Sequence, residues 1–144
     1  MGTAARCDVA RGLQTYQSIN VTNHRPLDGA RVLVVGSTLV RLPGLSKRLL
    51  EQGARRVDLA QALDVALGSC ACGPIDVAVL PGRLGQLSGH TLARVLRSVA
   101  PNLAVLFVQE DAPGASTPGD VVLKAPATTQ DVVRALRRMR REAA

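Results

Sequence analysis

The stretch Arg31-Val-Leu-Val-Val35, followed by Gly36, decides the fold of this chain. It is a short apolar run ended by a glycine, a pattern typical of a buried β-strand. Leucines then recur with helical spacing between Leu39 and Gln52, and Gly53 ends that pattern. The stretch therefore predicts a strand that leads directly into one helix.

The alternation of strand and helix continues along the chain. Further strands are predicted at residues 56–59, 75–80, 103–108 and 121–123, and further helices at residues 60–67 and 87–99. Thr128 or Thr129 can cap a last helix that runs to about Glu142. Strands that alternate with helices over short connections favour right-handed βαβ units and a parallel sheet. We therefore predict an α/β fold.

The composition indicates a single domain. The chain has 144 residues, of which 47% are hydrophobic, and this is enough for one core of ordinary size. Tyr16 and Phe107 are the only aromatic residues, so little surface is available for stacking on nucleic-acid bases. No stretch reaches the roughly 20 apolar residues of a membrane-spanning helix. We predict a soluble cytoplasmic protein without a membrane span, and we do not expect nucleic acid as its partner.

Several blocks of the sequence match a known family in their order and spacing. They are residues 31–41, 76–81, 81–89, 105–109 and 121–126. Through these blocks, residues 31–142 resemble the receiver domain of bacterial two-component response regulators and hybrid histidine kinases. The resemblance implies a doubly wound, five-stranded parallel sheet of strand order 2-1-3-4-5. It also implies a receiver-like domain over residues 30–144, preceded by an extension or linker over residues 1–29.

The chemistry of that family is missing at the positions that should carry it. The resemblance places Gly36 and Ser37 at the acidic pair that holds Mg²⁺, and Pro81 at the aspartate that accepts the phosphoryl group. Glycine and serine supply no carboxylate for a hard cation, and proline has no nucleophilic side chain. Gln109 replaces the usual switch hydroxyl, whereas Lys124 is retained. We therefore predict a degenerate pseudo-receiver with no catalytic residue, no metal site and no cofactor.

Nearby carboxylates are not expected to replace the missing ones. Glu110 and Asp111 follow the fourth strand, and Asp76 begins the third. Because each strand residue advances about 3.3 Å, Asp76 should lie a full strand length from the phosphorylation site.

Two regions depart from the receiver pattern. Residues 110–120 contain two prolines and two glycines where the family has its fourth helix, so we predict a helix that is shortened or absent. Loss of that helix would expose a flank of the sheet, and three interpretations remain open. The flank is a docking surface for another protein, it is covered by residues 1–30, or the segment is an ordinary shortened loop. Residues 8–18 can form one or two amphipathic helical turns or a disordered tail.

The last helix is rich in arginine and suggests an alternative function. Arg137, Arg138 and Arg141 have the charge to bind the phosphates of a nucleotide or cyclic dinucleotide. The turn Gly36–Thr38 offers a second phosphate cradle. The ordinary interpretation is that these arginines lie on the solvated face of an amphipathic helix.

The cysteines predict no metal site. Cys7, Cys70 and Cys72 are an odd number, and no second thiol pair or histidine cluster completes a tetrahedral set. We interpret the Cys-Ala-Cys segment as small residues in a loop over residues 68–74.

The sequence as a whole predicts a non-catalytic module. We expect a pseudo-receiver that binds another protein, or a second copy of itself, in a bacterial signalling assembly. The alternative is a small-ligand sensor that holds a nucleotide at the basic helix or at the degenerate pocket.

Overall fold

The computed structural model describes residues 14–17, 27, 29–109, 121–124 and 127–143 of the chain. Its main sheet has six strands in the order β1-β3-β2-β4-β7-β8. The strands are β1 (Gln14–Gln17), β2 (Arg31–Val35), β3 (Arg56–Ala60), β4 (Val77–Pro81), β7 (Ala104–Gln109) and β8 (Val121–Lys124). Five of these strands, β2, β3, β4, β7 and β8, are mutually parallel. The predicted doubly wound sheet of order 2-1-3-4-5 is therefore confirmed.

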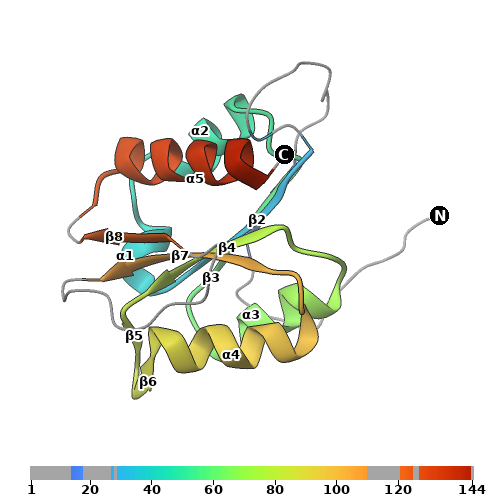
Figure 1. Cartoon of the computed structure of the whole chain (residues 1–144), viewed down its shortest axis with the longest axis vertical. Helices are drawn as coiled ribbons and strands as arrows, with labels where there is room; N and C mark the ends of the chain where they lie inside the picture. Colours follow the sequence, from blue (N-terminus) through green and yellow to red (C-terminus); the bar gives the residue numbers. More distant parts are fainter. Residues whose placement is uncertain (1–13, 18–26, 28, 110–120, 125–126, 144) are drawn as a thin grey trace.

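Helices cover both faces of this sheet (Figure 1). Helices α1 (Ser37–Val40), α2 (Leu45–Glu51) and α5 (Thr129–Ala143) lie on one face, and α3 (Leu63–Ala71) and α4 (Gly89–Val99) lie on the other. A two-stranded hairpin, β5 (Arg83–Leu84) with β6 (Leu87–Ser88), connects β4 to α4. The predicted loss of the fourth receiver helix falls on residues 110–120, which lie outside the described residues.

The apolar run that predicted the first strand is buried on both sides. Val32 and Val34 pack in the core under α1, α2 and α5, whereas Leu33 and Val35 pack in the core under α3 and α4. All four side chains are fully buried. Two covered faces leave no polar position in the strand, and this explains why the run is continuous rather than alternating.

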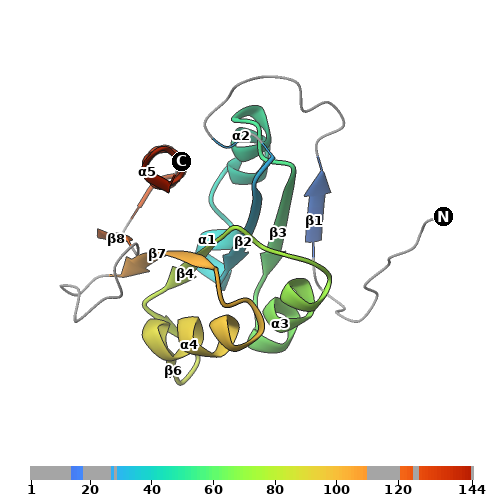
Figure 2. The same ribbon diagram turned by 45° about the vertical axis from the view of Figure 1, so that its right-hand side comes forward.

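The sheet has one strand more than predicted. β1 pairs antiparallel with β3 at an end of the sheet, with Thr15 opposite Asp58 and Tyr16 opposite Val57 (Figure 2). The helical turns considered for residues 8–18 are wrong over Gln14–Gln17, because pairing with β3 supplies backbone hydrogen bonds that the local sequence does not announce. Leu27, from the predicted extension or linker over residues 1–29, is fully buried in the core. Parts of the predicted extension thus pack onto the domain.

The first predicted helix is broken into two. We expected one helix from Leu39 to Gln52, but α1 ends at Val40 and α2 begins at Leu45. Pro43 has no N–H to donate, and Gly44 adopts a left-handed conformation with φ of 66°. The hydroxyl of Thr129, at the start of α5, donates a hydrogen bond of 2.7 Å to the carbonyl oxygen of Pro43. The break is therefore tied to the last helix.

Two helix boundaries differ from the sequence prediction. The segment Gly68–Ala71 belongs to α3 and not to a loop, so Cys70 is helical and only Cys72 follows at the end of the helix. The next helix, α4, begins at Gly89 rather than Leu87, because Leu87 and Ser88 form a strand of the hairpin.

The start of the last helix agrees with the prediction. The backbone N–H of Asp131 donates to the hydroxyl of Thr128, and the backbone N–H of Thr128 donates to the carboxylate of Asp131, each over 3.1 Å. This reciprocal pair caps two otherwise unpaired N–H groups. The hydrogen bonds from Thr128 hold the pKa of Asp131 below its ordinary value. None of the helices within the described residues combines the length and apolar character needed to cross a membrane.

Candidate functional site

The carboxyl ends of the parallel strands bring the predicted site residues to one edge of the sheet. Gly36 follows β2, Pro81 ends β4, Gln109 ends β7 and Lys124 ends β8. Pro81 lies opposite Val108 in the ladder, and Gln109 lies opposite Lys124. This edge is where doubly wound sheets bind their ligands. The structure thus places the four residues where the sequence predicted them.

Gly36 and Pro81 pack directly against each other. A Cβ atom built on Gly36 would lie 3.1 Å from Cγ of Pro81 and within 3.5 Å of two further atoms of the ring. Gly36 is buried and has a φ of 107°, a conformation that residues with side chains rarely adopt. The pyrrolidine ring therefore occupies the space that a side chain at Gly36 would need.

The hairpin after β4 leaves equally little room. A Cβ atom on Gly82 would lie 2.7 Å from Cβ of Gln109, and one on Gly89 would overlap the carbonyl oxygen of Pro81. The N–H of Gly89 also donates to the carbonyl oxygen of Gly82 over 2.8 Å. Glycine at these positions allows the hairpin and the start of α4 to close against the end of the sheet.

The polar groups of the site lie at its rim. Ser37 is exposed at the start of α1, and Lys124 is exposed at the end of β8. Gln109 is half-buried beside Gly82. The centre of the site therefore consists of backbone atoms and the ring of Pro81, whereas the ionisable side chain of Lys124 lies at the rim.

Solved structures with the same architecture identify the fold. A response regulator receiver domain from Methanospirillum hungatei JF-1 matches with a TM-score of 0.63 at 18% identity, over 78% of this chain and 94% of that chain. A receiver protein from Sinorhizobium medicae WSM419 matches with a TM-score of 0.65 at 21% identity, over 82% and 99%. The chain has the receiver fold.

A third structure shows the chemistry of one such protein. A response regulator from Burkholderia pseudomallei, solved with a phosphorylated aspartic acid, a calcium ion and citrate, matches with a TM-score of 0.60 at 23% identity. The match covers 79% of this chain and 70% of that chain. The sequence matches no protein-family model and no curated protein.

Within the receiver fold, the described residues at this edge do not fit a divalent cation. Mg²⁺ requires several oxygen ligands in octahedral geometry, but Gly36, Ser37 and Pro81 offer no carboxylate, and the ring of Pro81 stands against Gly36. The described residues contain no group of three acidic, histidine or cysteine side chains that could hold a metal ion. Asp76 lies at the opposite end of β4, where its carboxylate accepts the backbone N–H of Arg31 over 2.8 Å. It is therefore no substitute ligand.

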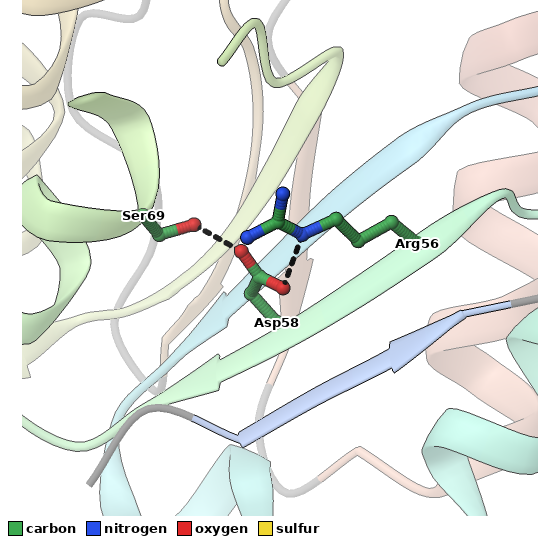
Figure 3. Close-up of polar contacts among 3 residues, drawn as sticks. All are labelled: Arg56, Asp58 and Ser69. Carbon is green, nitrogen blue, oxygen red and sulfur yellow. Dashed lines mark hydrogen bonds and ion pairs between the residues drawn. The ribbon is translucent and has the colours of Figure 1, made fainter. Parts of the chain in front are cut away.

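A buried polar cluster was not predicted from the sequence. Asp58 on β3 is fully buried, and its carboxylate accepts hydrogen bonds from Nε of Arg56 over 2.9 Å and from the hydroxyl of Ser69 on α3 (Figure 3). The one signal in the sequence is the alternation of Arg56 and Asp58 with apolar residues. Such alternation normally indicates a strand face in water, whereas here α3 covers that face.

Cys70 lies beside this cluster. Burial raises the pKa of its thiol, and the charge of Asp58 raises it further. A thiol with a raised pKa remains protonated near neutral pH and is a poor nucleophile.

The arginines of the alternative prediction lie on α5. Arg138 is exposed, whereas Arg137 is half-buried and its Nε has no hydrogen-bond partner in the described part of the chain. The side chain of Arg141 lies outside the described residues. The other proposed cradle, Gly36–Thr38, spans the N-cap and the first two residues of α1. A helix of only four residues has a small dipole to favour phosphate. Nucleotide binding stays a prediction.

Proposed function

We propose that this chain is a receiver-fold regulatory module that is not phosphorylated at the usual position and acts by binding another protein. The observation that carries the proposal is the contact between Pro81 and Gly36. It fills the end of the sheet with a ring that has neither a nucleophile nor a backbone N–H.

Two separate requirements of phosphoryl transfer fail at this edge. An acyl phosphate needs a carboxylate nucleophile, and the resemblance to receivers places Pro81 at that position. The transfer also needs a cation to neutralise developing charge, and no carboxylate stands at Gly36 or Ser37. Either loss alone would prevent the reaction, so the two together argue against selection for phosphorylation.

Contact with a protein is the activity that remains for such a module. The fold is retained with a closely packed sheet end, while Lys124 and Arg83 stand exposed around it. Surface residues of this kind can recognise a partner by charge without any chemistry. We propose a protein partner in a bacterial signalling assembly in the cytoplasm, and we do not propose an enzymatic activity.

Acetyl phosphate should leave the protein unmodified. We expect no mass increase in intact-mass spectrometry and no shift in a phosphate-affinity gel after incubation with acetyl phosphate and Mg²⁺. The single variant Pro81→Asp should also remain unlabelled, because it regains the nucleophile but not the cation ligands. A hydroxylamine-sensitive phosphoryl group on the unaltered protein would contradict the proposal.

Reversal of the rim charges should weaken capture of the partner. We expect the full chain to retain a stoichiometric protein from native lysate, and the variant Arg83→Glu/Lys124→Glu to retain much less. Arg94→Glu, a charge reversal at another exposed position, on α4, is the control and should behave like the parent. Equal capture by all three proteins would place the contact elsewhere. A bound nucleotide without any protein partner would favour the ligand-sensor alternative.

A further inference from the structure

Strand β1 forms one end of the main sheet, and its outer edge has no strand beside it within the described residues (Figure 2). The strand is Gln14-Thr-Tyr-Gln17, in which Thr15 and Tyr16 are exposed. An edge strand presents unpaired N–H and C=O groups that can hydrogen-bond to another strand. The receiver pattern begins at β2, so the edge is an addition to the fold.

The edge is short but carries none of the side chains that usually prevent such pairing. Natural edge strands are protected by shortness, charged residues, prolines or bulges, and β1, with four residues, has no charged residue and no proline. The edge at the other end of the sheet, β8, ends with the exposed Lys124. Because the whole chain has a net charge of +7, two copies repel each other, and a neutral strand offers them a place to meet.

Tyr16 gives this edge an apolar surface. Its side chain is 42% exposed, and within the described residues only Val99 on α4 is a comparably exposed large hydrophobic residue. Tyr16 also borders an open groove of about 730 Å³, whose apolar lining includes Leu42, Leu50 and Leu59. The groove lies between β1 and the break that separates α1 from α2.

We propose that two copies of this chain associate by pairing their β1 strands antiparallel across a twofold axis, with Tyr16 facing the partner's Tyr16. Directly opposite residues of an antiparallel ladder point to the same face of the sheet. A twofold axis perpendicular to the sheet leaves the same face of the sheet on the same side in both copies. A residue at the axis therefore lies opposite the same residue of the second copy. Tyr16 at the axis buries two exposed rings against each other, and aromatic cross-strand pairs are stabilising.

The same arrangement extends the sheet beside the groove. Tyr16 lies opposite Val57, and so on the same face as Leu59 of the groove lining. The second β1 adds its ring to this face and shields the open side of the groove. Lys47 and Glu51, which also line the groove, carry opposite charges, so the two groove linings bring no net like charge together. The dimer does not depend on the function proposed for the degenerate pocket.

The single tyrosine of the chain gives a specific test. Because Tyr16 is the only tyrosine, a dityrosine link between two chains can join only Tyr16 to the partner's Tyr16. We expect the 144-residue protein to sediment as a dimer, and brief photo-oxidative cross-linking to give a covalent dimer with dityrosine fluorescence. A protein that stays monomeric at every concentration tested, without dityrosine, would overturn the proposal.

Variants separate this interface from other ways of forming a dimer. Tyr16→Lys places two like charges opposite each other and should raise the dimer dissociation constant by about tenfold or more. Tyr16→Phe should keep the dimer and lose the dityrosine link, and Val99→Lys should change neither readout. If Tyr16→Lys fails to fold, Tyr16→Phe and the cross-link still decide the question. A dimer that gives no dityrosine and survives Tyr16→Lys uses another face and overturns the proposal.

Discussion

Replacement of Asp58 by alanine should lower the free energy of unfolding by about 3 kcal/mol. The carboxylate is fully buried and accepts hydrogen bonds from Arg56 on its own strand and from Ser69 on α3. Its removal leaves a guanidinium and a hydroxyl without their acceptor, and an uncompensated buried polar group is costly. Because the side chain of Arg56 is 17% exposed, water can partly solvate it, and we expect the lower end of the range for broken buried ion pairs.

Chemical denaturation followed by circular dichroism can measure this loss. Ser69→Ala is the matched control, since it removes one hydrogen bond and leaves the ion pair, and should cost about 1 kcal/mol. The triple variant Arg56→Met/Asp58→Leu/Ser69→Ala should recover much of the loss, because apolar replacements of a buried ionic cluster are often tolerated. An Asp58→Ala variant no less stable than Ser69→Ala would show that the ion pair with Arg56 adds nothing to the hydrogen bond that links α3 to β3.

The parts of the fold that the sequence predicted are those with strong local patterns. The runs at Val32–Val35, Val77–Leu80 and Val105–Val108 are apolar because helices cover both of their faces. Alternation with helices then limits the topology to a few arrangements. The five-stranded parallel order followed from these runs together with the resemblance to receivers.

The parts that were missed depend on contacts between distant segments. Nothing in Gln14-Thr-Tyr-Gln17 predicts a strand until the edge of β3 lies beside it. The break at Pro43 did have a local signal, but leucines at helical spacing on both sides outweighed it. The sequence did not predict the buried cluster at Asp58, because the burial of Asp58 depends on α3 packing over it.

The site shows the same division. The strand patterns, together with the resemblance to receivers, assigned Gly36, Pro81, Gln109 and Lys124 to the ends of four strands. They could not predict that the ring of Pro81 fills the space in front of Gly36, since that distance depends on how two neighbouring strands twist. Their role as a degenerate phosphorylation pocket stays a prediction.

Replacement of Gly89 by alanine should destabilise the protein by about 3 kcal/mol. Gly89 begins α4, and alanine there would ordinarily favour the helix by about 1 kcal/mol. Here the added Cβ would overlap the carbonyl oxygen of Pro81 and lie 3.3 Å from Cδ1 of Phe107. The oxygen belongs to the backbone of β4 and cannot rotate away, so β4 or α4 must shift. Thermal or denaturant unfolding, compared with the parent, measures the effect.

Gly68→Ala provides the control of opposite sign. Gly68 is half-exposed within α3, and alanine there should be neutral or stabilising. If Gly89→Ala were as well tolerated, the hairpin would have room to move, and the packed end of the sheet could open enough to admit a ligand. A large loss at Gly89 alone would mean that Pro81, the hairpin and the start of α4 form one rigid unit. A partner that binds at this edge would then meet a preformed surface. No phosphorylation step would be needed to arrange that surface.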